Sequence, residues 1–112
     1  MNNREEYIIC AAVWFDDGIE RAHQPINIKT GLVVCGRRHH NCFMTMGTLV
    51  GLVKDRNEIG LQEKEQGFVT SFDRFVTREE AAEIALKQDQ FANDDERTEV
   101  QKSNYLYSEN IY

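Results

Sequence analysis

Two arginines, two histidines and an asparagine occur together in residues 36–43, and this combination could bind an anion. The segment reads Gly-Arg-Arg-His-His-Asn-Cys-Phe. It follows an apolar run at 32–35 and leads into residues 42–53, where apolar side chains recur at helical spacing. The first turn of a helix offers free N–H groups and the positive end of the dipole, so arginines there favour phosphate or pyrophosphate. The candidate residues are Arg37, Arg38, His39 and Asn41, and a polar turn that only starts a helix is the alternative.

The same segment contains both kinds of side chain that commonly bind zinc. The potential ligands are Cys35, His39, His40 and Cys42. A structural zinc site needs four ligands, usually from two separated pairs, and the chain has no second pair. A nuclease of the HNH type would need a metal-binding histidine downstream, and none follows His40. We therefore predict no metal and no cofactor, with a small metal-binding protein as the alternative.

Familiar catalytic motifs do not occur in the sequence. There is no G-x-S-x-G, no Walker A motif and no H-E-x-x-H. Glu79 and Glu80 are adjacent, so on a helix they point about 100° apart and do not form an opposed acid–base pair. His39 has no identifiable nucleophile or orienting carboxylate beside it in the sequence. We predict a protein that is not an enzyme; a hydrolase acting on a nucleotide and a ligand-free interaction subunit are the alternatives.

Three apolar, β-prone runs would form the sheet that positions the candidate residues. The predicted strands are residues 7–15, 32–35 and 67–71. An Asp-Asp-Gly turn signal ends the first strand, and an irregular arm at 19–30 joins it to the second, which we expect to be antiparallel. Residues 61–66 are charged and are predicted to be an exposed segment before the third strand.

The first helix should run from about His40 to Val53, and its apolar stripe is the strongest periodic signal in the chain. Gly47 and Gly51 lie one turn apart, although each glycine costs a helix about 1 kcal/mol relative to alanine. Two glycines at this spacing suggest that another backbone packs closely against the helix.

The second helix has the clearest start signal. Thr77 and Glu80 form a capping box, and the helix should end near Asp89. Residues 93–103 are acidic and polar and are predicted to be a loop, and residues 105–112 are predicted to be a docked aromatic tail. The predicted fold is α+β: a single domain, residues 1–112, with a small antiparallel β-sheet and two α-helices packed on it.

Composition narrows the range of partners. The 112 residues carry a net charge of −6, which disfavours duplex nucleic acid because that affinity depends on neutralising phosphates. No apolar run is long enough to span a membrane. The three cysteines form no C-x-x-C motif, and the N-terminus does not resemble a signal peptide, so a cytoplasmic location is predicted. Cys10 and Cys35 lie in apolar runs and are expected to be buried.

The order of short motifs along the chain resembles a family of small phage and prophage proteins. The motifs are Ala-Ala-Val at 11–13, an Arg-His-containing helix start ending in Cys42, and residues 65–71, 74–82 and 106–110. The family includes the first Thoeris anti-defence protein. The resemblance implies a homo-oligomer, from dimer to hexamer, in the host bacterial cytoplasm. Such proteins act as sponges: they bind a cyclic ADP-ribose immune signal without degrading it, and some also hold cyclic oligonucleotides at separate sites.

A cyclic ADP-ribose ligand implies further site residues, because it has a pyrophosphate, two riboses and an adenine. It needs cations for phosphate, aromatic faces for the base and polar groups for the hydroxyls. The residues that could supply these are Phe68, Thr70, Ser71, Arg74, Phe75, Arg78, Tyr107 and Ser108. Core packing is the alternative for Phe68 and Phe75. Exposed surface charge is the alternative for Arg74 and Arg78.

Overall fold

Strand β1 (Ile8–Asp16) lies inside the sheet because both of its edges are hydrogen-bonded. It pairs with β2 (Leu32–Gly36) on one side and with β3 (Gln62–Thr70) on the other, both antiparallel. Strand β4 (Phe75–Thr77) then pairs with β3. The order is therefore β2-β1-β3-β4 in the part of the chain that the structure describes.

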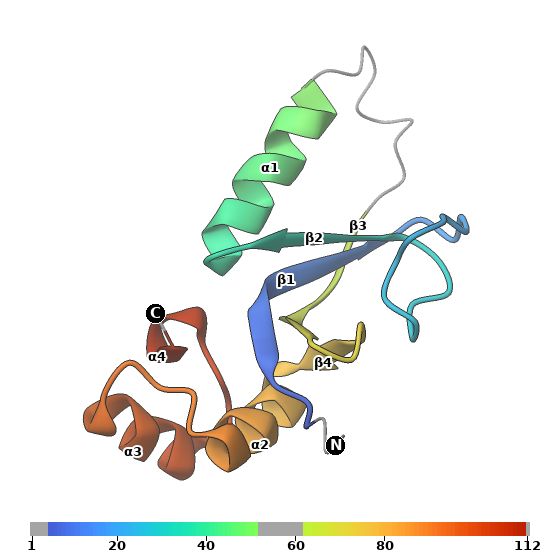
Figure 1. The fold of residues 1–112 in the computed structure, drawn as a ribbon. Helices are drawn as coiled ribbons and strands as arrows, with labels where there is room; N and C mark the ends of the chain where they lie inside the picture. The colour runs from blue at the N-terminus through green and yellow to red at the C-terminus, as the bar shows by residue number, and fades with distance from the viewer. Residues whose placement is uncertain (1–4, 52–61, 112) are drawn as a thin grey trace.

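A computed structural model gives the positions of residues 5–51 and 62–111, and Figure 1 shows them as one α+β domain. This confirms the predicted fold class and the antiparallel pairing of the first two strands. None of the helices in these residues is long and apolar enough to cross a membrane.

Helix α1 (His39–Gly51), which the periodicity predicted, covers one end of the sheet. Its side chains Cys42 and Met46 pack on Val13, Phe15 and Val34. These contacts bury a single stripe of the helix, while most of its other side chains are exposed. The last predicted residues of this helix, 52 and 53, lie outside the described residues.

Residues 78–111 pack at the other end of the sheet, where α2 and α3 lie away from α1 and α4 lies near the first turn of α1 (Figure 1). Its helices in the described residues are α2 (Arg78–Gln88), α3 (Asp94–Ser103) and α4 (Ser108–Ile111). Alanines of α2, Val100 and Leu106 pack there with Ile8, Ala11, Phe68 and Val76. A register shift between Ile8 and Cys10 places Ile8 on the same face as Ala11, which adds an apolar side chain to this core.

The start of α2 confirms the predicted capping box. The Thr77 hydroxyl accepts a hydrogen bond from the Glu80 N–H, and the Glu80 carboxylate accepts one from the Thr77 N–H. The helix ends at Asp89, which adopts a left-handed backbone with φ of 54°. Both ends of this helix are therefore set by local residues.

Residues 93–103 were predicted to be a loop, and this prediction is wrong because they form α3. Asn93 caps the helix by accepting a hydrogen bond from the Glu96 N–H. Acidic residues in the first turn and Lys102 in the last turn complement the helix dipole. Val100 is fully buried and attaches the otherwise polar helix to the core.

The third strand is longer than predicted, and β4 was not predicted at all. Residues 62–66, expected to be an exposed charged segment, are the first half of β3 and pair with β1. Their side chains are largely exposed, which explains the polar sequence. Strand β4 is short, and Gly67 lets it approach β3: a Cβ at Gly67 would lie 2.0 Å from the Val76 carbonyl oxygen.

The predicted irregular arm folds back over the face of the sheet opposite the helices. Ile28 packs on Ala12 and Phe75. The Asn27 side chain accepts a hydrogen bond from the Phe75 N–H and donates one to the Phe75 carbonyl. The Asn27 side chain thereby attaches the arm to β4, with the same kind of paired backbone hydrogen bonds that a neighbouring strand would make.

Candidate functional site

A cavity of about 680 Å³ opens where the start of α1 faces α2 and the C-terminal segment. Seven of the twelve predicted site residues line it: Arg37, Arg38, His39, Asn41, Arg78, Tyr107 and Ser108. His40 and Glu109 complete its lining. We call this space the arginine cavity.

The turn before α1 places its polar side chains at the rim of the arginine cavity. The Asn41 side chain accepts a hydrogen bond from the Arg38 N–H at 3.1 Å, and the Asn41 N–H donates to the Arg38 carbonyl at 3.0 Å. These paired bonds tighten the strand-to-helix turn. The prediction that this segment joins a strand to a helix is therefore confirmed.

His39 is held against β3. Its Nε2 lies 2.8 Å from the Gly67 carbonyl oxygen, and its ring meets Phe68 edge to face with centroids 5.0 Å apart. Burial lowers the pKa of His39, so the neutral ring donates its Nε2–H to that carbonyl at neutral pH. His39 thus supports the cavity as a structural group attached to the sheet.

Arg78 is held in place by two hydrogen bonds and a ring contact. Its Nη1 donates to the Leu106 carbonyl at 2.9 Å and its Nη2 to the Gln66 side chain at 2.8 Å. Its guanidinium carbon lies 4.5 Å from the centroid of the Tyr107 ring. Burial lowers the pKa of Arg78, but the guanidinium stays charged because its ordinary pKa is far above neutrality.

Glu109 is a site residue that our sequence interpretation missed. Its carboxylate lies 3.9 Å from Arg38 Nη1 and accepts a hydrogen bond from the Ser108 hydroxyl at 3.0 Å. Burial raises the pKa of Glu109, but its own N–H, Ser108 and Arg38 together leave that pKa below the ordinary value. The quoted motif at 106–110 contains this residue, so that motif was the signal that could have found it.

The electrostatics of the cavity contrast with those of the whole chain. Among the described residues that line it, the arginines are Arg37, Arg38 and Arg78, and the carboxylate is Glu109. The whole chain, by comparison, carries a net charge of −6. With the exposed ring of Tyr107 beside Arg78, the arrangement can bind phosphate and stack a base.

Phe68 and Phe75 do not line the arginine cavity. Their exposed fractions are 0% and 5%, so neither offers a free ring face. Phe68 lies beneath His39 in the helical core, whereas Phe75 packs on the opposite face of the sheet with Ile28. The core-packing alternative therefore describes both phenylalanines.

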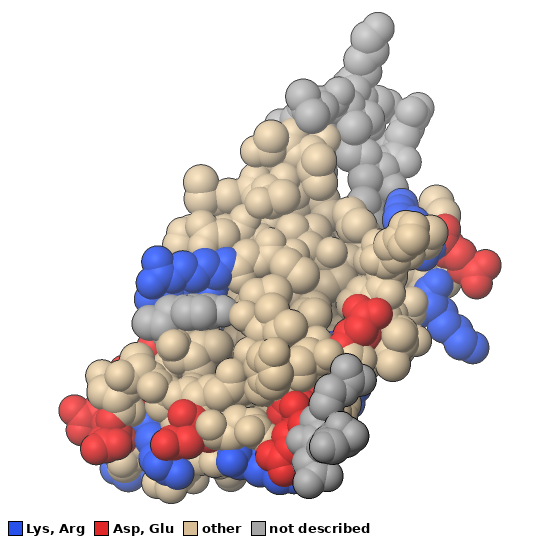
Figure 2. Space-filling view, in the orientation of Figure 1, with Lys and Arg blue, Asp and Glu red and all other residues tan. Residues whose placement is uncertain are grey.

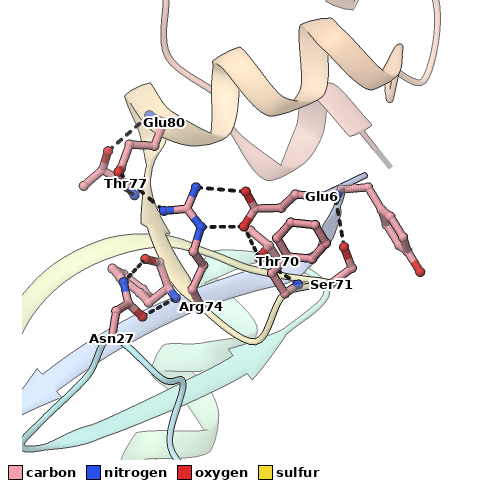
Figure 3. Close-up of polar contacts among 10 residues, drawn as sticks. Glu6, Asn27, Thr70, Ser71, Arg74, Thr77 and Glu80 are labelled. Carbon is pink, nitrogen blue, oxygen red and sulfur yellow. Dashed lines mark hydrogen bonds and ion pairs between the residues drawn. The ribbon is translucent and has the colours of Figure 1, made fainter. Parts of the chain in front are cut away.

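Thr70, Ser71 and Arg74 are engaged in a network on β3 and the following turn (Figure 3). Arg74 donates from Nε and Nη2 to the two carboxylate oxygens of Glu6, at 2.5 and 2.9 Å. The Thr70 hydroxyl donates to the same carboxylate at 2.6 Å, and the Ser71 hydroxyl accepts from the Tyr7 N–H. The network fastens the N-terminal segment to the β3–β4 turn, so these residues do not join the arginine cavity.

The potential zinc ligands have other partners in the fold. Cys42 is buried with its Sγ 3.8 Å from the Ala11 carbonyl oxygen, and His39 is bonded to Gly67. Among the described residues, no three histidine, cysteine or acidic side chains converge as a metal site would require. Cys35, which we expected to be buried, is exposed.

A protein-family model for the phage T4 y16D protein matches residues 7–112. The chain belongs to the phage T4 y16D protein family. The match includes every residue that lines the arginine cavity, and it supports the predicted phage origin. No curated protein and no solved structure matches the chain.

Proposed function

We propose that this phage protein binds a small nucleotide-derived anion in the arginine cavity and holds it without chemical change. The ligand class we infer is an immune signal of the cyclic ADP-ribose type, sequestered in the host bacterial cytoplasm. The observation that carries the proposal is the gathering of Arg37, Arg38 and Arg78 around one cavity of an acidic chain. Such a cluster favours phosphate over other small ligands.

The state of Arg78 supports tight and slow-release binding. Its guanidinium is already oriented by Leu106, Gln66 and Tyr107, so little side-chain freedom is lost when a ligand binds. The arginine fork also pairs with phosphate oxygens at two points, which a lysine does not. A sequestering protein gains from both properties.

The Ser108 hydroxyl and the His39 imidazole favour binding over catalysis. Ser108 is almost fully buried and its hydroxyl donates to Glu109, so it does not face a substrate atom. His39 is buried and its Nε2 is bonded to a backbone carbonyl. A general base or nucleophile has to reach the reacting atom within hydrogen-bond distance, and these two groups are turned elsewhere.

Self-association is the second part of the proposal. Helix α1 contains no Lys, Arg, Asp or Glu, and the surface over it is uncharged in Figure 2. Phe43, Met44 and Leu49 of this helix are exposed. We infer that a second copy of the chain covers this surface, because the helix lacks the charge that would favour an acidic or basic partner.

Mass spectrometry can test retention and turnover together. Cyclic ADP-ribose is mixed with the protein, unbound ligand is removed, and the protein is heated to release what it holds. The expected result is release of unchanged ligand, in an amount reduced strongly in an Arg37→Ala/Arg38→Ala variant. A linearised or hydrolysed product that increases with incubation time would identify a hydrolase instead. If no ligand is retained, or the arginine variant retains as much as the wild type, the proposed site is wrong.

A further inference from the structure

A second cavity, of about 410 Å³, lies on the other side of Arg78 and Tyr107. These two residues line both cavities and therefore form their shared wall. The first half of β3 and the start of α2 supply the carboxylates of the second cavity, and the segment after α3 supplies another tyrosine. We call it the acidic cavity, after Glu63, Glu65 and Glu79.

The two cavities differ in charge. Apart from the shared Arg78, the arginine cavity has two arginines and the carboxylate of Glu109, whereas the acidic cavity has the three glutamates and Lys64. The Lys64 ammonium lies 6.0 Å from the centroid of the Trp14 ring. With Lys64 and Arg78 counted, the carboxylates among the described residues that line the acidic cavity still outnumber the cations, three to two. A phosphate would be attracted to the first space and repelled from the second.

The acidic cavity instead suits an uncharged group with several N–H or O–H donors. Carboxylates accept hydrogen bonds from exocyclic amines and from sugar hydroxyls. Tyr105 and Tyr107 are 43% and 47% exposed, so their rings can offer flat apolar surface. A nucleobase has a flat face for stacking and amine donors at its edge, and a ribose has hydroxyl donors, so the two together suit this cavity.

We infer that one ligand spans both cavities across the Arg78–Tyr107 pair, with its phosphates in the arginine cavity and a base with its ribose in the acidic cavity. This inference rests on the proposed function. It specifies a ligand whose phosphates are adjacent, as in a pyrophosphate, with an uncharged end. A cyclic dinucleotide, whose two phosphates are separated by the sugars and bases, would place one phosphate among the glutamates or leave the acidic cavity empty.

Isothermal titration with cyclic ADP-ribose and with cyclic di-GMP tests the inference. Wild-type protein should bind cyclic ADP-ribose at least tenfold more tightly. Tyr105→Ala should weaken that binding at least about fivefold by removing a stacking face, and Tyr105→Phe, which keeps the face, should stay within about twofold of wild type. A Glu65→Lys/Glu79→Lys variant should shift the preference toward cyclic di-GMP. All three positions are exposed, so folding should be preserved.

The outcomes separate the inference from the proposed function. If Arg37→Ala/Arg38→Ala weakens binding but the Tyr105 and glutamate variants do not, the ligand uses the arginine cavity alone and the inference fails. Equal wild-type affinity for the two probes also overturns it. If the arginine variant binds like wild type, or neither probe binds wild type, the proposed function fails as well.

Discussion

The guanidinium carbon of Arg78 lies 4.5 Å from the centroid of the Tyr107 ring, and this contact joins the first residue of α2 to the C-terminal segment. The same side chain donates to Gln66 on β3 and to the Leu106 carbonyl. Arg78 therefore connects three segments of the fold while it lines both cavities. Its role in stability and its role in binding should be separable by substitution.

Replacing Arg78 with lysine should destabilise the protein by about 1–3 kcal/mol, because an ammonium group cannot make both hydrogen bonds and also lie over the ring. Urea unfolding followed by the fluorescence of Trp14, the single tryptophan, measures this change. Arg97→Lys is a matched control, since Arg97 forms an exposed ion pair with Asp89 and should change stability by under about 1 kcal/mol. Equal stability of both variants would contradict a structural role for Arg78.

Glu6 should make stability depend on pH. Hydrogen bonds from Arg74 and Thr70 and the charge of Arg74 hold the pKa of Glu6 below its ordinary value, although partial burial opposes this shift. A carboxylate whose folded pKa is lowered stabilises the fold above its unfolded pKa, and that contribution is lost as the pH falls through the lowered folded value. We expect a Glu6→Gln variant to be less stable at pH 7 by about 1–3 kcal/mol and to lose part of the acid dependence.

Unfolding free energies of wild type and variant at several pH values between 3 and 7 provide the test. Glu83→Gln is the matched control, because Glu83 is an exposed residue of α2 and should leave the pH profile unchanged. The role of Glu6 would be disproved if Glu6→Gln and wild type lost stability in parallel as the pH falls.

Local signals predicted those elements whose boundaries are set by neighbouring residues. The Thr77–Glu80 capping box identified the start of α2 because all of its partners lie within four residues. The same logic applies to Asn93 at the start of α3, but the acidic composition of residues 93–103 suggested a loop. The single buried side chain of Val100 gave too weak an apolar pattern to reveal the helix.

The sequence pattern alone located only the local part of the site. Arg37, Arg38, His39 and Asn41 belong to one turn, so the sequence pattern located them together. The pairing of Arg74 with Glu6 joins residues 68 positions apart, and no pattern along the chain indicates it. Arg74 was therefore assigned to the ligand when its charge is already balanced within the fold. The contact of Arg78 with Tyr107 joins two residues that the resemblance had named for the site, but their proximity in space emerges only from the docking of the C-terminal segment.

Cys35 should be the most reactive of the three thiols. It is exposed, and a hydrogen bond from Cys10 stabilises its thiolate and lowers the pKa of Cys35. Burial raises the pKa of Cys42 to about 11, so that thiol is protonated at neutral pH. Iodoacetamide alkylation followed by peptide mass spectrometry should modify Cys35 first, at a rate that increases with pH through the neutral range.

Cys10→Ser is the matched comparison for the reactivity of Cys35. It replaces the thiol that donates to the Cys35 thiolate with a hydroxyl, and it nearly keeps the size of the side chain. The variant should react at Cys35 with a pH profile displaced from that of wild type. Faster labelling of Cys42 than of Cys35 in the native protein would contradict the assignment.

Gly47 offers the cleanest test of self-association. A Cβ built on this residue meets no atom of the described residues within 4 Å beyond its chain neighbours and the backbone of its own helix, so Gly47→Leu should not clash inside one molecule. It should instead raise helix stability by about 1 kcal/mol, since glycine is a poor helix former. Phe43 and Met44, both exposed, lie one turn before Gly47 on the same side of α1. A leucine there would obstruct a second copy that packs on this side.

We therefore expect Gly47→Leu to shift the protein toward monomer in sedimentation or light scattering while its monomer unfolds no more easily than wild type. Thr45→Leu adds similar bulk on the opposite side of the exposed helix and should leave assembly intact. Gly67→Ala should behave differently from both, because its Cβ would lie 2.0 Å from the Val76 carbonyl oxygen and the fold itself would be disrupted. A wild-type protein that is strictly monomeric at micromolar concentration would disprove self-association. If Gly47→Leu assembled like the wild type, the contact between copies would lie on another surface.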